Sequence, residues 1–575
     1  MAGPTPTVIN GGSVPPGSPP PDLSRSTPDG KGIVSQELFR QGDIVISREQ
    51  VTGGDQFSDL LVINGGAGDD NVQVSQRANG VLDVQINGQP YEITLAAQQQ
   101  LGVRGGDGND IIHAGPNVRV NMDVQGGNGN DTITTGRGRD RVDGGAGDDT
   151  ISTGRGRDDV FGNTGNDTID AGGGNDVVYG GDGNDILRGG QGRDYLEGGR
   201  GNDTLEGGQG NDILSGGQDN DILRGGQGND RVYTGAGADT VDNRSGRDTV
   251  YGQSGEDTIT AARGARNTQV EVDMTTNVGA TVTVAAGSSD AFRQRVEADL
   301  DMLRSSNNGR EMLSELDRNA SPAIGTGHSV SITELGNEMN GYAGPSLTND
   351  AFLQTDPATG VTTRGAGMDS VISYNPSFHS DFFETPTVVL HHEMSHAYNI
   401  TGGTLQQGVY SGTGPDSGSV RNFERQAVGL DNSGVAFDFD HNAATPDTKT
   451  NPRNLTENGM RDEMGLTRRP DYSVDAKSAF SAPGNPSATG ANPNGGHNHS
   501  HAHLDALLQA MESGDRSATR EATRALAEQP PGQAMRHEAI HAVDRQEQQA
   551  QAETQAQAQQ QQQAEPAQSA GGMRR

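Results

Sequence analysis

A strict nine-residue spacing of aspartates constrains the fold of this chain more than any other feature of its sequence. Fifteen aspartates follow one another at that interval within residues 131–257, and Asp70 and Asp110 look like outlying copies. An Ile, Val or Leu stands two residues after each of the fifteen. A fixed period of this kind indicates one structural unit per repeat, stacked so that the apolar residues form a continuous internal ladder. The sequence therefore predicts a solenoid of short strands.

The residue types of the repeat indicate a cation-binding solenoid. Glycine permits positive-φ turns and exposes backbone carbonyls, and each aspartate supplies a hard carboxylate oxygen. The unit G-G-x-G-x-D-x-U-x, where U is apolar, resembles the nonapeptide of the RTX calcium-binding parallel β-roll. That resemblance implies calcium ions between successive turns and calcium-dependent folding; the competing interpretation is a calcium-free solenoid or a disordered glycine-rich spacer. The expected calcium ligands are Asp131, Asp149, Asp167, Asp176, Asp185, Asp194, Asp203, Asp212, Asp221 and Asp230.

The two sides of the predicted roll differ in charge. Alternate repeats share a side of each eighteen-residue coil, and one side has no Arg directly before its aspartates. The other side carries Arg139, Arg157, Arg193 and Arg247 at that position. A guanidinium beside a carboxylate competes electrostatically with a bound cation. We therefore predict fuller calcium occupancy on the side without Arg, which carries mainly Asn.

A second chemical pattern lies beyond the repeats, in the stretch VVLHHEMSHAYN at residues 388–399. A threonine suited to a helix cap and a proline suited to the first turn precede it. On such a helix His392 and His396 leave the same face and can reach one zinc ion. Glu393 beside them can take a proton from metal-bound water. The competing interpretation is a surface helix with two unligated histidines.

A catalytic zinc site needs a third protein ligand and one open position. Downstream, residues 419–432 predict a helix with Glu424 in its first turns, and Glu424 is the expected third ligand. Its competitors are Asp438, Asp440 and His441. The sequence also predicts helices at 288–306 and 309–318 and a strand at 369–376.

Four stretches around this helix carry a family resemblance: SYNPSF, TPTVVLHHEMSHAYN, NFERQAVGL and NPRNLTENGMRDEMGLTRRPDY. They resemble the NleD-type effector metallopeptidases, which are bacterial zinc endopeptidases delivered into host cells. The similarity covers about residues 285–475. It implies zinc binding by His392 and His396, Glu393 as general base, and a Glu-type third ligand, which we place on Glu424.

The resemblance also assigns the walls of the active site. Residues 455–472 would form one wall, where Arg461 or Tyr472 would donate a hydrogen bond to the oxyanion. The competing interpretations are a surface Arg and a packing Tyr. Tyr374 and Asn375, on the strand before the helix, would line the substrate cleft. The long repeat is a departure from compact members of that family.

Composition limits the partners of the chain. Its formal charge of −35 at pH 7 opposes binding to nucleic acid and to anionic membranes. The absence of Cys excludes disulfides and thiolate metal sites. An apolar run of membrane-spanning length and a basic-then-apolar N-terminus are both missing from the sequence. We therefore expect neither a transmembrane segment nor a cleaved hydrophobic leader.

Five regions are predicted along the chain. They are a disordered Pro/Ser/Gly-rich segment (1–50), the β-roll (51–262), connecting strands (263–284), an α+β zincin-like metallopeptidase domain (285–480), and a disordered end with a His-rich linker, a helix and a Gln/Ala-rich tail (481–575). A second pattern, HEAIH at 537–541, is not expected to hold zinc because no core is available to supply a third ligand. The alternating histidines at 497–503 are expected to be a solvated linker, with loose metal binding as the alternative.

The expected function is that of a secreted bacterial zinc endopeptidase that cleaves host proteins and carries a calcium-binding module. We expect one catalytic zinc ion, several structural calcium ions, a protein substrate, a monomer and an extracellular location, with delivery into host cells as a further step. The alternative is a calcium-binding adhesin or scaffold whose hydrolase-like domain is inactive.

Overall fold

The computed structural model describes residues 6–14, 19, 21–26, 32–51, 59–243, 245–253, 255–261, 267–274, 276–323, 325–335, 341–342, 351–376, 385–413, 415–439, 447–470 and 472. The histidines at 497–503, the HEAIH pattern at 537–541 and the Gln/Ala-rich tail lie outside these residues. Asp440 and His441, two competitors for the third zinc ligand, lie outside them as well.

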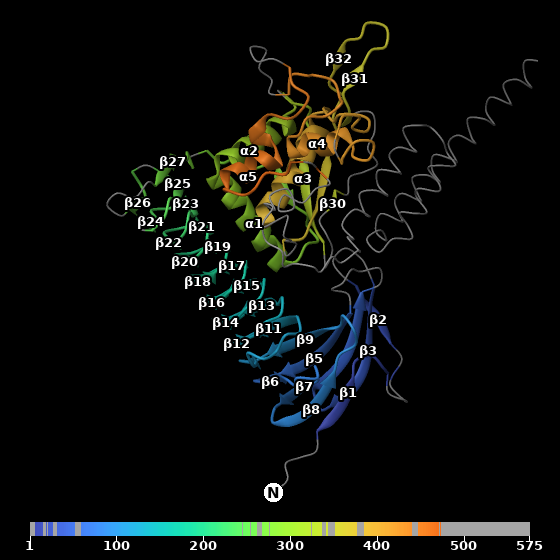
Figure 1. The fold of residues 1–575 in the computed structure, drawn as a ribbon, viewed down its shortest axis with the longest axis vertical. Helices are drawn as coiled ribbons and strands as arrows, with labels where there is room; N and C mark the ends of the chain where they lie inside the picture. Colours follow the sequence, from blue (N-terminus) through green and yellow to red (C-terminus); the bar gives the residue numbers. More distant parts are fainter. Residues whose placement is uncertain are drawn as a thin grey trace, which may run out of the picture. The chain divides into compact units, whose positions relative to one another are not determined.

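Two long sheets stack along the repeats and form a β-roll (Figure 1). Within the described residues, the 13-stranded sheet contains, in spatial order, β1 (Thr7–Asn10), β8 (Gln89–Thr94), β7 (Leu82–Ile86), β6 (Asn71–Gln76), β10 (Ile111–Ala114), β12 (Thr132–Thr134), β14 (Thr150–Ser152), β16 (Thr168–Asp170), β18 (Ile186–Gln191), β20 (Thr204–Gln209), β22 (Ile222–Gln227), β24 (Thr240–Asn243) and β26 (Thr258–Ala261). The 14-stranded sheet contains β2 (Asp22–Ser26), β3 (Gly32–Gln41), β4 (Ile44–Val51), β5 (Asp59–Ala67), β9 (Gln100–Asp107), β11 (Met122–Asn128), β13 (Arg141–Ala146), β15 (Asp159–Thr164), β17 (Val177–Asp182), β19 (Tyr195–Arg200), β21 (Ile213–Gln218), β23 (Arg231–Ala236), β25 (Thr249–Gly252) and β27 (Thr268–Glu271). The parallel β-roll predicted from the repeats is confirmed.

Burial of the apolar ladder explains why the repeat strands stack. Each one pairs in register with the strand 18 residues later, so Leu187, Leu205 and Leu223 lie next to one another along the roll. All three are fully buried in the core between the two sheets. Because every repeat adds one such residue, every coil adds apolar burial, which is the main favourable term in folding.

The N-terminal end differs from the disordered segment predicted for residues 1–50. Strands β3 and β4 pair antiparallel with each other, and β4 pairs antiparallel with β5. Strand β1 joins the 13-stranded sheet beside β8. The glycine and proline content of this segment favoured disorder, but its strands contain an alternation of apolar and polar residues that buries Leu38 and Ile46 in the core of the roll. The ordered structure therefore begins before residue 51, and its first strands form an antiparallel cap on the roll.

A second, α+β region follows the roll, as predicted. Its four-stranded sheet has the order β28 (Val282–Val284), β29 (Val330–Glu334), β33 (Ser370–Tyr374) and β30 (Gly341–Tyr342), and β31 (Gln354–Thr355) and β32 (Thr362–Thr363) form a separate pair. Its helices are α1 (Asp290–Ser305), α2 (Asn307–Ala320), α3 (Pro386–Thr401), α4 (Asn422–Val428) and α5 (Glu457–Glu463), with a 3₁₀ turn at Arg453–Leu455. Residues 263–284, predicted as connecting strands, contain β27, which belongs to the roll, and β28, which belongs to the new sheet.

Helix α3 lies at the centre of the second region. It packs against α1, α2, α4, α5 and β33, which explains why it is buried on every side. Among the described residues, the helices are too short or too polar to cross a membrane.

Candidate metal centre

Helix α3 presents the two histidines of the predicted site. Thr385 caps the helix by accepting a hydrogen bond from the backbone N–H of Val388, and Pro386 occupies the first turn. His392 and His396 follow one turn apart, and their Nε2 atoms are separated by 3.2 Å. Both imidazoles therefore face the same point, as their spacing predicted.

Glu424 brings a carboxylate to that point from α4. Its Oε2 atom lies 3.2 Å from Nε2 of His396 and 3.9 Å from Nε2 of His392. The donor atoms of the three residues lie within 4.8 Å of one another, and all three side chains are buried. Two imidazole nitrogens and one carboxylate oxygen fit a zinc ion with one coordination position left open. Within the described part of the chain, no other group of three such residues converges in this way.

A network of amide side chains holds α4 beside α3. Gln426 on α4 donates to Oδ1 of Asn399 at 2.8 Å and to Oδ1 of Asn451 at 3.0 Å. Asn451 in turn donates to Oγ of Ser395 at 2.9 Å. Because Gln426 lies two residues from Glu424, these bonds fix the position of the carboxylate relative to the histidines.

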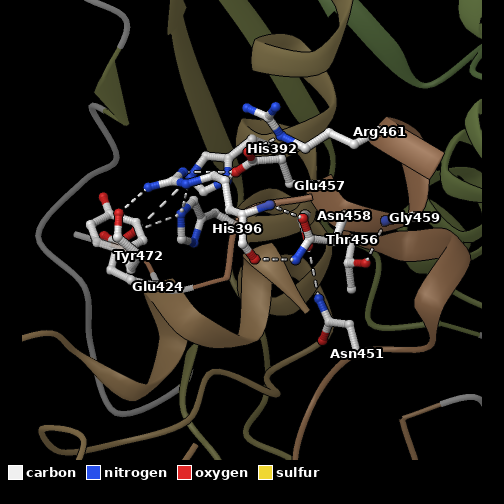
Figure 2. A network of polar contacts seen from close by, with 12 residues as sticks. His392, His396, Glu424, Asn451, Thr456, Glu457, Asn458, Gly459, Arg461 and Tyr472 are labelled. Carbon is white, nitrogen blue, oxygen red and sulfur yellow. Dashed lines mark hydrogen bonds and ion pairs between the residues drawn. The ribbon is translucent and has the colours of Figure 1, made fainter. Parts of the chain in front are cut away.

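Glu457, the first residue of α5, contacts His392 on the ring edge opposite to Glu424 (Figure 2). Its Oε2 atom lies 2.9 Å from Nδ1 of His392, which leaves Nε2 for a metal ion. Arg461 and Arg469 donate to the two oxygens of Glu457 at 2.6 and 2.9 Å. Burial raises the pKa of Glu457, but Arg469, Arg461 and His392 together hold it well below its usual range. An ionised carboxylate therefore orients the histidine.

Sequence analysis did not single out Glu457. A Glu directly after a Thr at a helix start is typical of helix capping, and Thr456 does cap α5 by accepting from the N–H of Gly459. Only the fold brings this Glu to His392. Arg461 does not fit the predicted role of hydrogen-bond donor to the oxyanion, because its guanidinium pairs with Glu457 and donates to the carbonyl oxygen of Thr467. Of the two residues, only Tyr472 remains a predicted donor to the oxyanion.

Tyr472 lies beside the histidines. Its ring centroid is 6.5 Å from that of His392, and the guanidinium of Arg469 lies 4.7 Å from its ring centroid. The backbone N–H of Tyr472 donates to Oδ2 of Asp416 at 2.7 Å, and Asp416 is itself paired with Arg425 on α4. These contacts anchor Tyr472 next to the centre.

Glu393 and His396 complete the polar groups of the centre. Glu393 follows His392 on α3 and is buried, with 5% of its surface exposed. Burial lowers the pKa of His396, but Glu424, Glu393 and Glu457 together outweigh it, so the net shift is upward. A metal ion competes with that proton, and its binding is therefore expected to weaken as the pH falls.

The remaining predicted site residues lie elsewhere. Tyr374 is fully buried and donates from its hydroxyl to Oδ2 of Asp299 at 2.7 Å, so its predicted place in the substrate cleft is wrong. Its strand β33 turns the ring toward α1 instead. Asn375, the next residue, is buried as well. Asp438, the described competitor for the third ligand, is not among the converging donors.

The roll carries two rows of buried carboxylates. In each row Oδ1 of one repeat aspartate accepts from the backbone N–H of the aspartate 18 residues earlier, as Asp167 does from Asp149 at 2.7 Å and Asp176 from Asp158 at 2.9 Å. Oδ2 of Asp257 accepts from Thr234 and Gln253, whereas from Asp131 to Asp248 the Oδ2 atom of each repeat aspartate has no hydrogen-bond partner. This holds for all ten predicted ligands, Asp131, Asp149, Asp167, Asp176, Asp185, Asp194, Asp203, Asp212, Asp221 and Asp230.

Other oxygens converge on these Oδ2 atoms. A β-carbon at Gly162 would lie 2.2 Å from Oδ2 of Asp167 and 2.5 Å from the carbonyl oxygen of Gly180. One coil later, a β-carbon at Gly180 would lie 2.4 Å from Oδ2 of Asp185 and 2.6 Å from the carbonyl oxygen of Gly198. Glycine is therefore required at these positions, and carboxylate and carbonyl oxygens are the ligands that calcium prefers.

The buried carboxylates titrate far from their usual range. Burial, together with the charge of the neighbouring aspartates, raises the pKa of Asp176 and of Asp221 to about 9. The same causes raise the pKa of Asp185 to about 8. A bound cation would stabilise the ionised form, which fits a calcium site. Because both rows carry the unpartnered oxygen, the asymmetry in occupancy stays a prediction.

Comparison with protein families agrees with both parts of the structure. Residues 280–472 match the peptidase family M91, described as "Effector protein". The RTX calcium-binding nonapeptide repeat matches at residues 103–116, 125–160, 152–187, 161–196, 179–214, 188–223, 206–241, 215–250 and 244–266. The chain joins RTX repeats to an M91 effector domain. Both predicted resemblances are confirmed, and no curated protein matches the chain.

The two matches define what each part contributes. The M91 effector domain implies a peptidase with a protein substrate, and its match contains His392, His396, Glu424 and Tyr472. The RTX match implies calcium binding and contains all ten predicted calcium ligands. The chain is therefore a peptidase effector with an RTX module.

Proposed function

We propose that the M91 effector domain is a zinc endopeptidase that hydrolyses peptide bonds in host-cell proteins. The observation that carries the proposal is the convergence of His392, His396 and Glu424, with Glu393 on the same helix. Zinc held by these three residues would supply a Lewis acid for the peptide carbonyl and a water molecule of lowered pKa. The M91 match supports the peptidase part of this proposal.

The surrounding residues have separate roles. Glu393 is the proposed general base, which takes a proton from the attacking water and delivers it to the leaving amine. Tyr472, anchored beside His392, is the proposed donor to the carbonyl oxygen as negative charge develops there. Glu457 keeps His392 in the tautomer and orientation that direct Nε2 toward the shared point.

We further propose that the protein is secreted and that its RTX roll binds several calcium ions outside the producing cell. The RTX match and the unpartnered buried Oδ2 atoms support calcium binding. Extracellular calcium would compensate the repulsion between the stacked carboxylates when they are ionised, which otherwise destabilises the roll. A monomer that neither binds nucleic acid nor enters membranes fits the strongly acidic composition.

The test of this function uses the full-length protein and the variant Glu393→Gln. Each is incubated with a host-cell lysate, and new protein N-termini are identified by mass spectrometry. We expect the variant to lose about 10²–10⁴-fold in cleavage rate, because the base is removed while the ligands stay. Zinc and calcium contents, measured by elemental analysis, should be unchanged.

The control for this test is Glu311→Gln, an identical substitution at an exposed position of α2. It should cleave as the wild type does. A wild type that contains zinc but generates no new N-termini would contradict the endopeptidase. It would instead favour a calcium-binding adhesin or scaffold with an inactive domain.

A further inference from the structure

Many outward side chains of the 14-stranded sheet between β15 and β25 are apolar or aromatic. Strand registers place them in two neighbouring rows that run across the sheet, and the same two rows also contain Asp159, Glu197, Ser215, Arg231 and Thr249. We call seven of them the docking face: Phe161, Val177, Tyr179, Tyr195, Ile213, Tyr233 and Tyr251. Every one of the seven is buried. At the corresponding outward positions of the 13-stranded sheet, Ile186 and Ile222 are exposed, and the next row carries charges such as Arg188 and Glu206.

The peptidase domain covers the docking face. Helix α1 contacts β17, β19, β21 and β23, and the seven residues share one hydrophobic core with α1, α2 and α3. Phe292, Val296 and Leu303 of α1 are fully buried in that core. The roll thus supplies one wall of the peptidase core.

A buried carboxylate connects the docking face to the sheet of the peptidase domain. Asp299 on α1 is fully buried and accepts from the hydroxyl of Tyr179 at 2.8 Å. Its other oxygen accepts from the hydroxyl of Tyr374 on β33 at 2.7 Å. The hydroxyl of Thr387 on α3 also donates to Asp299, at 3.4 Å. One side chain therefore links the roll, β33 and the start of the helix that carries the histidines.

Two further contacts lead from the docking face to the metal centre. The hydroxyl of Tyr195 lies 2.7 Å from Oγ1 of Thr387, which is five residues before His392 on α3. The hydroxyl of Tyr251 donates at 3.3 Å to the carbonyl oxygen of Glu463, the last residue of α5. The same short helix begins with the carboxylate that orients His392. Both helices that position this histidine therefore touch the roll.

We propose that the docking face is an interaction surface for the chain's own peptidase domain, and that calcium binding in the roll thereby organises the metal centre. This regulation would act on the proposed zinc site and rests on that proposal. Calcium favours the folded roll, and α1 and α3 can dock only on the folded roll, so the two events are thermodynamically linked. Where calcium is scarce, α3 loses one wall of its core and the histidines lose their fixed geometry.

The experiment measures hydrogen exchange of the full-length protein by mass spectrometry across a calcium titration, with zinc held constant by a metal buffer. The peptide covering α3 reports the metal centre, and peptides covering β15–β23 report the roll. We expect exchange of α3 amides to slow by about tenfold or more at the calcium concentration that protects the roll. Equal protection of α3 with and without calcium would overturn the proposal.

A matched pair of variants separates docking from roll folding. Ile213→Asp places a charge on the buried docking face, and Ile222→Asp makes the same change on the exposed outer face of the 13-stranded sheet. We expect calcium to protect the roll in both variants, but to protect α3 only in Ile222→Asp. Equal protection of α3 in the two variants would contradict a docking role for the face.

A milder variant covers the case in which Ile213→Asp prevents the roll from folding. Tyr195→Phe keeps the ring and removes only the hydroxyl, which contacts Thr387 and Asp299 of the peptidase domain and Glu197 of its own strand. It should leave the roll protected at the wild-type calcium concentration and speed exchange in α3; unchanged α3 exchange would count against the proposal. None of these measurements requires peptide cleavage, so failure to find a substrate would refute the proposed function and leave this test intact.

Discussion

The roll and the proposed metal centre both place buried carboxylates where a cation could bind, but they are built in opposite ways. The roll repeats one environment from coil to coil, in which one oxygen of an aspartate accepts a hydrogen bond from a backbone N–H and the other has no hydrogen-bond partner. The metal centre gathers three different ligands from two helices once, and supports them with residues that occur once. A single substitution should therefore have a large effect at the centre and a small one in the roll.

The largest effect is expected for Glu424→Ala, which removes the third ligand. Two imidazoles alone hold zinc poorly, so we expect zinc affinity to fall by at least about 100-fold and cleavage to be lost. Zinc retained after dialysis against a competing chelator measures the change. Glu311→Ala on the exposed face of α2 is the control. Stoichiometric zinc in Glu424→Ala would show that another group supplies the third ligand.

A smaller effect is expected for Glu457→Gln. The neutral amide cannot offset the charges of Arg461 and Arg469, and it accepts from Nδ1–H of His392 more weakly than the carboxylate does, so zinc affinity should fall about 10–100-fold. Titration of the metal-free protein with zinc gives the dissociation constant. Thermal unfolding of the same samples shows whether the fold is retained. An unchanged zinc affinity in a folded variant would mean that the carboxylate plays no part in metal binding.

The third prediction concerns the calcium-free roll and its dependence on pH. Its aspartates have raised pKa values, of about 7 for Asp149 and about 9 for Asp176, because burial disfavours the charged form. The unfolded chain ionises near its ordinary pKa while the folded roll keeps these protons, so stability is full below that pKa and is lost as the pH rises through about 7–9. Without calcium, the roll should therefore withstand more urea at pH 5 than at pH 8.

Circular dichroism across urea series at the two pH values, with and without calcium, checks this dependence. Calcium should restore stability mainly at pH 8, where it replaces the missing protons. A calcium-free roll that is most stable at pH 8 would contradict burial as the cause of the raised pKa values.

The smallest effect is expected from the asymmetry between the two sides of the roll. Arg139 and Arg157 precede Asp140 and Asp158 on the side predicted to bind less calcium. Replacing both arginines by Asn removes the competing positive charges, and we expect the calcium content per chain to rise by about one or two ions. Elemental analysis of the two proteins at equal free calcium measures the difference. An unchanged content would show that both sides bind calcium equally.

The sequence predicted those features that depend on short, regular spacing. The period of nine fixes which residues face inward, and the four-residue interval places His392 and His396 on one face of α3. Glu424 was within reach of the same reasoning because it lies early in the next predicted helix. Glu457 was not, because its role depends on how α5 packs against α3.

The docking face had a signal in the sequence that was not used. Three residues after the aspartate, four of the alternate repeats carry Phe161, Tyr179, Tyr233 and Tyr251, with Asp143, Glu197 and Ser215 in the others of that set. The intervening repeats carry only Thr, Ser or charged residues there. Large aromatic side chains at outward positions of a soluble roll indicate that another element covers them. The predicted place of Tyr374 in the substrate cleft was wrong for the same reason, because its partner Asp299 lies on a helix that packs against the roll.

The antiparallel cap has a consequence for assembly. Where a stack of parallel strands ends, its last strand has a row of unpaired backbone N–H and C=O groups. Another coil of the same kind could pair with these groups in register. Strands β3, β4, β7 and β8 close one end of this stack with hairpins, whose lateral pairing cannot continue the parallel coil. An N-terminal truncation through β8 would leave β9 and β10 as the exposed end strands of the two sheets. A second molecule could pair with them, and head-to-tail filaments would be the expected product.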